Sequence, residues 1–235
     1  MKRVVLPFAV VAAALAVGAM PAGATNECRG LQVCVRVAGP WVVVPAGVRT
    51  PRTPVQFQLS CPRSFLVGGL DAELSDRAID IDFAGLLGSP VNPGTTTTRH
   101  ALFRAVYTGA SARVTTFRPH IGCIPVPGGG SGPVPYRLPE AFPPGQPTIR
   151  RVRTVRILPG TVRAVTACAA GERLIFGWHA VGFYSASAPS AALVQSVTTT
   201  RVLRGNRVEV RARADATVRS VRAVLQVGAV CGGGS

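Results

Sequence analysis

Residues 207–214 have the sequence Arg-Val-Glu-Val-Arg-Ala-Arg-Ala, in which charged and apolar side chains alternate strictly. A period of two puts the apolar side chains on one face of an extended chain, which predicts a half-buried β-strand. Just before it, Arg204-Gly205-Asn206 predicts a hairpin turn, because Gly and Asn tolerate positive φ. The chain also carries 26 glycines and 20 prolines among 235 residues, which favours many turns and short strands. Similar alternation recurs in residues 55–61, 79–83, 162–168 and 221–231.

The six cysteines suggest an internal duplication. Cys61 is followed by Cys123, and Cys168 by Cys231, at nearly equal spacing. Between them, residues 65–72 match 173–180, aligning Asp71 with His179, and Thr-Thr-Thr-Arg occurs at 96–99 and 198–201. These matches in the same order predict two tandem small antiparallel β-sandwich or barrel units within an all-β protein.

Each unit is expected to be closed by its own disulfide. The cysteines end alternating patterns and share the inward face of the first and last strands of a unit. We therefore expect the pairs Cys61–Cys123 and Cys168–Cys231, which leaves Cys28–Cys34 as a local loop. Closing a loop of about 62 residues restricts the unfolded chain by about 4 kcal/mol.

The first 24 residues have the features of a secretory signal peptide. Lys2 and Arg3 precede an apolar run from Val4 to Val17, and Ala22-Gly23-Ala24 supplies a small-residue cleavage site. An even cysteine count fits the oxidising environment outside the cell. We therefore expect a secreted protein that could associate with the cell wall. No later apolar run approaches the ~20 residues that a membrane-spanning helix needs.

Composition divides the remainder of the chain into four segments. Residues 25–54 are expected to pack as an added strand on the first unit, residues 55–123. Residues 124–148 are rich in proline and glycine and predict a linker. Residues 149–235 form the second unit, which is rich in arginine.

The first unit resembles a family of repeats. Ser60-Cys61-Pro62, the pair Gly68-Gly69 and the returning Cys123 resemble repeats of secreted proteins of actinobacterial type, which open with Cys-Pro and Gly-Gly and close on a strand with Cys. The resemblance covers residues 55–123 and, less fully, 161–231, where Ala169 replaces the proline. It implies an extracellular β-rich module and implies no activity.

Basic charge is concentrated in the second unit. The net charge is +16, and residues 149–235 hold thirteen arginines against three acids, whereas residues 55–123 hold six against five. Such a face attracts polyanions, which outside a cell include anionic wall polymers and acidic polysaccharides. Codon bias and solubility are the alternative explanation. With no recognition helix and few aromatics, sequence-specific nucleic-acid binding is not expected. The candidate polyanion-binding residues are Arg201, Arg204, Arg207, Arg211, Arg213, Arg219 and Arg222.

Half of the ten acidic residues lie between positions 71 and 82. Oxygen-rich clusters suit Ca²⁺, and the candidate ligands are Asp76, Asp80 and Asp82. Asp80 and Asp82, two apart on a predicted strand, could also serve glycoside hydrolysis. A solvated strand face that balances nearby arginines is the third interpretation.

Signatures of catalysis are lacking in the sequence. It has no Gly-x-Ser-x-Gly elbow, Walker sequence or dinucleotide fingerprint, and its three histidines are not spaced as metal pairs. Trp178-His179 with Phe183-Tyr184 could form a sugar-stacking platform or belong to the core. We expect a noncatalytic binding module, without a cofactor unless Ca²⁺ binds. A structural or protein-interaction repeat protein is the alternative, then a hydrolase that uses Asp80 and Asp82; the oligomeric state stays open.

Overall fold

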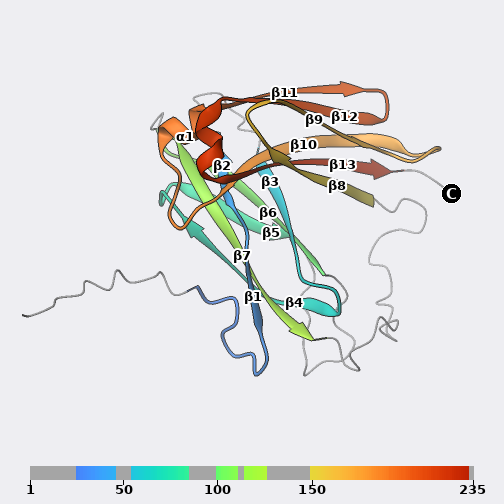
Figure 1. Ribbon diagram of the computed structural model, residues 1–235. Helices are drawn as coiled ribbons and strands as arrows, with labels where there is room; N and C mark the ends of the chain where they lie inside the picture. Colours follow the sequence, from blue (N-terminus) through green and yellow to red (C-terminus); the bar gives the residue numbers. More distant parts are fainter. Residues whose placement is uncertain (1–24, 46–53, 85–98, 111–113, 126–148, 233–235) are drawn as a thin grey trace, which may run out of the picture.

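The computed structural model describes residues 25–45, 54–84, 99–110, 114–125 and 149–232 (Figure 1). The predicted signal peptide and nearly all of the predicted linker lie outside the described residues. Within these ranges the chain forms thirteen strands in three antiparallel sheets, which confirms the predicted all-β class. The described helices are too short to cross a bilayer.

The strands fall into two groups along the chain. The first group comprises β1 Val35–Ala38, β2 Trp41–Val44, β3 Val55–Ser60, β4 Phe65–Leu74, β5 Ile79–Ala84, β6 His100–Tyr107 and β7 Thr115–Pro125. The second comprises β8 Ile149–Ile157, β9 Gly160–Ala167, β10 Arg173–Tyr184, β11 Val197–Arg204, β12 Arg207–Ala214 and β13 Arg222–Gly232. The short helix α1, Ala191–Gln195, precedes β11, and the 3₁₀ turn η1, Ala216–Ser220, follows β12.

Alternation along β12 has the predicted effect. Val208, Val210 and Ala212 are fully buried, while Arg211 and Arg213 are exposed. The hairpin before it is also confirmed, since Gly205 has a φ of +54° and Arg204 pairs with Arg207. The inward face of β12 therefore supplies the core, and the arginines of its outward face are exposed.

The largest sheet has seven strands and joins both groups. β4 pairs with one edge of β7, and β1 and β2 pair in turn with the other edge. β2 also pairs with β10, where Val42 lies opposite Gly182, and the sheet continues through β13 to β8. The N-terminal segment therefore connects the two groups as well as extending the first.

The two groups have the same pairing pattern. The three-stranded sheet β3-β6-β5 and the pair β4-β7 in the first group match β9-β12-β11 and β10-β13 in the second. Both long pairs contain a register shift beside the closing cysteine, between Val67 and Gly69 and between Leu174 and Phe176. A further strand begins opposite each closing cysteine: Val35 of β1 faces Cys123, and Ile149 of β8 faces Cys231.

All three predicted disulfides are confirmed. Cys61, directly after β3, bonds to Cys123 in β7, and Cys168, directly after β9, bonds to Cys231 in β13. The Cα–Cα distances are 5.7 and 5.6 Å. Cys28 and Cys34 close a short loop near the N-terminus. Each long disulfide joins the three-stranded sheet of its group to the seven-stranded sheet.

The hydrophobic core has two parts, which share the seven-stranded sheet. Phe57, Phe103 and Phe117 are central to the first part, and Val208, Val210 and Leu225 to the second. Because the large sheet curls into a half-barrel, Ala180 of β10 and Val224 of β13 also pack into the first part. The described strands of the two groups are therefore packed together.

Different segments cover equivalent outer faces of the seven-stranded sheet. In the first group the N-terminal loop covers β7. It lies so close to this strand that a Cβ added to Gly122 would stand 2.1 Å from the Glu27 carbonyl oxygen. In the second group β3 lies against β13, and Gln226 accepts a hydrogen bond from the backbone N–H of Gln58 at 2.6 Å. The same side chain donates to the Gln58 carbonyl at 3.0 Å, so one amide satisfies the free edge of β3.

These registers correct the alignment of Asp71 with His179. Asp71 lies opposite His120, three residues before Cys123, whereas the residue opposite Gly228, three before Cys231, is Trp178. The sequence match was shifted by one because it equated Gly69 with Gly177, which face different positions of the neighbouring strand.

Candidate functional sites

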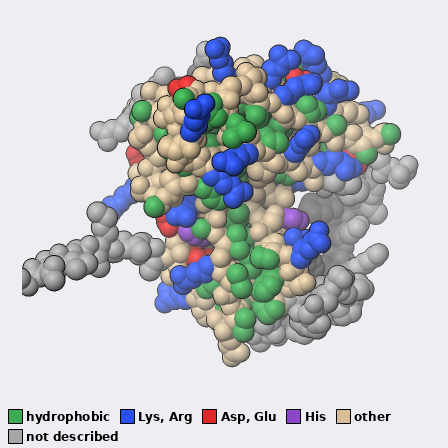
Figure 2. Space-filling view, viewed as in Figure 1, with side chains coloured by type: hydrophobic (Ala, Val, Ile, Leu, Met, Phe, Trp, Pro, Cys, Tyr) green, Lys and Arg blue, Asp and Glu red, His purple; other side chains and the backbone are tan. Residues whose placement is uncertain are grey.

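The basic face is the outer surface of the sheet β9-β12-β11. Pairing places Arg163 opposite Arg211, and Arg204 opposite Arg207, with Arg213 farther along β12. All five side chains are exposed because the opposite faces of these strands pack inward. Figure 2 shows basic side chains gathered over β11 and β12 at the top of the molecule, with few acidic ones among them. We call these five residues the basic face.

Glu209 is the one acidic residue of these three strands. Its carboxylate accepts two hydrogen bonds from Arg163, at 2.8 and 2.7 Å, and one from Arg211 at 3.2 Å. These bonds, with Arg163 the larger contributor, lower the pKa of Glu209 to about 2 despite the opposing effect of desolvation. Its charge is thus present at neutral pH, and the basic face keeps an excess of four positive charges.

The structure brings four of the seven predicted arginines together on this face: Arg204, Arg207, Arg211 and Arg213. Arg201 extends to the other side of β11 and donates to the Gly177 carbonyl at 2.8 Å. Arg219 lies in η1, and Arg222 stacks over the Tyr184 ring with its Cζ 4.7 Å from the centroid.

Arg163 is a member of the basic face that the sequence analysis missed. The alternation in the sequence could have identified Arg163, because Val162, Ala164 and Thr166 occupy the inward positions of β9. Arg163 lies between two of them and so faces outward.

The acidic cluster is spread over the end of β4, the turn after it and β5. Asp82 accepts hydrogen bonds from Nε and Nη2 of Arg104, at 2.6 and 3.0 Å, and Asp76 accepts one from the Ala78 N–H at 2.8 Å. Asp80 and Asp82 are both exposed, as expected for one strand face. Ligand atoms of these three aspartates do not gather within 4.8 Å of one another, so calcium binding stays a prediction without a preformed cage.

Within the described ranges, the one cluster with metal-ligand types is Cys168, Glu172 and Cys231. Both sulfurs belong to a disulfide, and Glu172 accepts hydrogen bonds from Arg151 and from the Ala169 N–H. These groups are thus already engaged in structural contacts.

The predicted aromatic platform is largely core. Trp178 is 2% exposed and lies over Gly228, where an added Cβ would stand 2.1 Å from its ring. Phe183 is fully buried, whereas Tyr184 is half-buried beneath Arg222. With Trp178 and Phe183 buried and Tyr184 beneath Arg222, these residues do not form a flat exposed platform on which a sugar could stack.

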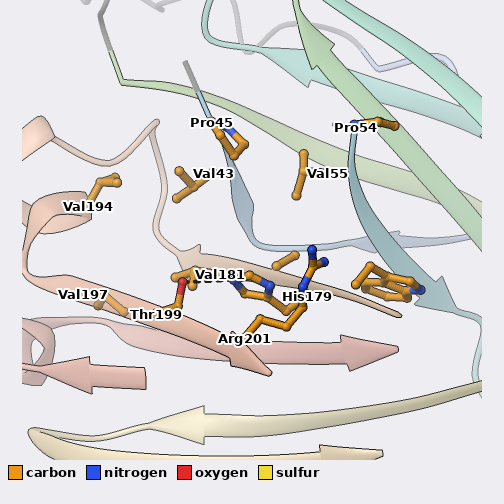
Figure 3. Close-up of a pocket in the computed structure, with 12 residues that line it drawn as sticks. Val43, Pro45, Pro54, Val55, His179, Val181, Val194, Val197, Thr199 and Arg201 are labelled. Atoms are coloured by element: carbon orange, nitrogen blue, oxygen red, sulfur yellow. Dashed lines mark hydrogen bonds between the residues drawn. The ribbon is translucent and has the colours of Figure 1, made fainter. Parts of the chain in front are cut away.

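A cavity of about 270 Å³ opens between β2, β3, β10, α1 and β11. Figure 3 shows apolar side chains above and beside it, with His179, Thr199 and Arg201 together below. His179 Nε2 and Thr199 Oγ1 are 2.9 Å apart and share a hydrogen bond. Desolvation, together with the nearby charge of Arg201, lowers the pKa of His179 to about 4, so this imidazole is neutral at physiological pH.

No family model matches this sequence, and neither the curated proteins nor the solved structures include a significant match. Inference about what the chain does therefore depends on the geometry of the basic face and of this cavity.

Proposed function

We propose that this protein is a secreted, noncatalytic module that binds anionic polymers of the extracellular space or the cell envelope through the basic face. The observation that carries the proposal is the group of five exposed arginines, Arg163, Arg204, Arg207, Arg211 and Arg213, around the single carboxylate of Glu209. A polymer with repeated negative charges can contact several of these side chains at once.

The shape of the face suits an extended polymer. Neighbouring strands are about 4.8 Å apart, and alternate residues of a strand about 6.8 Å apart, so the guanidinium groups form a two-dimensional array. Arginine binds carboxylates, sulfates and phosphates through paired hydrogen bonds. Binding on such an open face releases counterions and requires no induced cleft.

Secretion is supported by the signal-peptide features of residues 1–24 and by the three disulfides. Disulfides persist in oxidising environments and are rare in reducing ones. Polymers met in that setting include acidic polysaccharides and anionic wall polymers, which are the partner class we propose.

We also propose that the two groups of strands descend from one duplicated unit. Their common strand order, the matching register shifts and the equivalent disulfides support this history. After duplication, the outward positions of the second copy would have been free to accumulate arginine, because only its inward positions contribute to the core.

The experiment compares two charge-matched triple variants of the full chain. Neutralising Arg204, Arg207 and Arg213 to Gln removes three charges from the basic face and leaves the bonds to Glu209 intact. Neutralising Arg29, Arg63 and Arg77 to Gln removes three exposed charges from the N-terminal loop and the first group. We expect the first variant to lose at least about tenfold in affinity for heparin, and the second to lose little.

Equal losses in the two variants would show that net charge alone drives binding and would refute the basic face. Uncharged dextran serves as the polymer control, and its binding as tightly as heparin would also contradict the proposal. Circular dichroism on each variant establishes that the β-structure is retained.

A further inference from the structure

The cavity beside His179 has apolar walls that come from distant parts of the chain. Val43 of β2, Val55 of β3, Val181 of β10 and Val194 of α1 all line it. Its volume of about 270 Å³ exceeds the roughly 150 Å³ of an engineered apolar cavity that binds benzene. This space suits a compact organic molecule with an apolar body about the size of one aromatic ring.

Arg201 is the one charged side chain among the described residues that line this cavity. Its Nη1 donates to the Gly177 carbonyl at 2.8 Å, which holds the guanidinium beside His179. Because His179 is neutral, a ligand here meets one positive charge. A singly charged anion matches that charge, whereas a doubly charged phosphate would keep an uncompensated charge against apolar walls.

His179 and Thr199 lie beside Arg201 at the polar side of the cavity. Nε2 of His179 and the Thr199 hydroxyl already share a hydrogen bond at 2.9 Å. Nδ1 of His179 has no hydrogen-bond partner in the described part of the chain, but it is fully buried and so offers no contact to a ligand in the cavity. The charged contact for a ligand is therefore the guanidinium of Arg201.

We propose that this cavity binds a small monocarboxylate with a ring-sized apolar body, with its carboxylate on Arg201 and its body among the valines. Small-molecule sites usually combine mostly apolar walls with a few polar or charged groups, as the valines and the Arg201 guanidinium do here. The site is separate from the basic face, because Arg201 and the outward Arg204 lie on opposite sides of β11.

The test uses benzoate and its neutral isostere benzamide with the full, disulfide-bonded chain. We expect benzoate to bind saturably below about 10 mM and benzamide at least about tenfold more weakly, because benzamide forms no ion pair with Arg201. Benzoate is also expected to shift the imidazole NMR signals of His179 and to raise its pKa, since the bound anion offsets the charge of Arg201.

Two substitutions on β11 provide matched variants. Arg201→Leu is expected to abolish the preference for benzoate, whereas Arg204→Leu is expected to keep it. Val194→Trp fills the cavity and is expected to block both probes. Heparin binding supplies the distinction from the proposed function, because Arg201→Leu is expected to leave it nearly unchanged.

Benzamide binding as tightly as benzoate would overturn the proposal, as would the absence of saturable benzoate binding up to about 10 mM. Equal loss of benzoate binding in Arg201→Leu and Arg204→Leu would also overturn it. If Arg201→Leu fails to fold, the comparison of the two probes on the unsubstituted chain still decides the question.

Discussion

The sheets β3-β6-β5 and β9-β12-β11 have the same strand order but very different outward charge. In the first, Arg104 is matched by Asp82 through two hydrogen bonds, and Asp80 adds a further negative charge. In the second, Glu209 offsets only one of five arginines. The comparison shows that inward apolar side chains can maintain one architecture while outward positions carry opposite charge.

A second comparison concerns the long strand pairs. Trp178 on β10 and Asp71 on β4 occupy equivalent registers, yet Trp178 is buried on β10, which contacts β3, while Asp71 accepts a hydrogen bond from the Asn26 N–H of the N-terminal loop. Each position therefore carries a residue suited to the segment that covers it.

The largest expected effect comes from truncating Trp178, and Asp71 is the matched comparison. Trp178→Ala should lower the free energy of unfolding by about 3–5 kcal/mol, because it leaves a cavity over Gly228. Asp71→Ala should cost about 1 kcal/mol, since it removes hydrogen bonds near the surface. Denaturant titration of the disulfide-intact proteins measures both. Equal losses would mean that the two positions are covered alike.

Acid should destabilise the second group through His179. Its pKa is about 4 in the folded state and 6.5 ordinarily, so the unfolded chain takes up the proton first as pH falls. The contribution of His179 is therefore complete above pH 6.5 and is lost as pH falls to about 4, with a total of about 3 kcal/mol. The equivalent residue in the first group is Ala72, which does not titrate.

Unfolding free energies of the unsubstituted chain and of His179→Gln, measured between pH 7 and 4, isolate this contribution. The variant should lose less stability over the window. If the free energies of unfolding of the two proteins changed in parallel with pH, the assigned role of His179 would be contradicted.

A smaller effect is expected at Gln226 and its equivalent Arg118, each five residues before the closing cysteine. Gln226→Ala leaves the N–H and carbonyl of Gln58 without their partner and should cost about 2 kcal/mol. Arg118 Nε donates to the Gly39 carbonyl at 3.3 Å. Arg118→Ala should lower the free energy of unfolding by less than about 1 kcal/mol. Thermal unfolding compares them, and a larger loss for Arg118→Ala would reverse the interpretation of how β3 is held.

The last comparison concerns the two carboxylates that accept hydrogen bonds from arginine, Glu209 on β12 and Asp82 on β5. The pKa of Glu209 is lowered by its hydrogen bonds with Arg163, so its stabilisation is present above its ordinary pKa of 4.5 and is lost as pH falls toward about 2. Glu209→Gln should remove that acid dependence and strengthen heparin binding, because the basic face gains a net positive charge. Asp82→Asn is the control on the other sheet, where the carboxylate is 60% exposed, and should leave heparin binding unchanged. A decrease in affinity for Glu209→Gln would contradict this expectation.

Local periodicity was enough to predict strands β3, β5, β9, β12 and β13, and the repeat spacing added the disulfides. The inward positions of Cys61, Cys123, Cys168 and Cys231 follow from alternation, and their spacing indicated how they pair. Periodicity also marks Arg163 as outward, although only the pairing of β9 with β12 brings it to Arg211.

Long-range contacts could not be predicted in this way. The pairing of β2 with β10 and the bond between Gln226 and Gln58 depend on how the large sheet curls. The cavity joins residues from five elements between positions 43 and 201, and no local pattern relates them. The positions of Arg204 and Arg201 on opposite sides of β11 follow from the pairing of β11 with β12.

The salt dependence of heparin binding tests the central claim most directly, because each polymer charge contacted by an arginine releases counterions. The slope of log affinity against log salt should be steep for the unsubstituted chain. It should fall by about two to three in the variant that lacks Arg204, Arg207 and Arg213, and hardly change in the variant that lacks Arg29, Arg63 and Arg77. Equal slopes in all three proteins would contradict the assignment of the basic face as the binding surface.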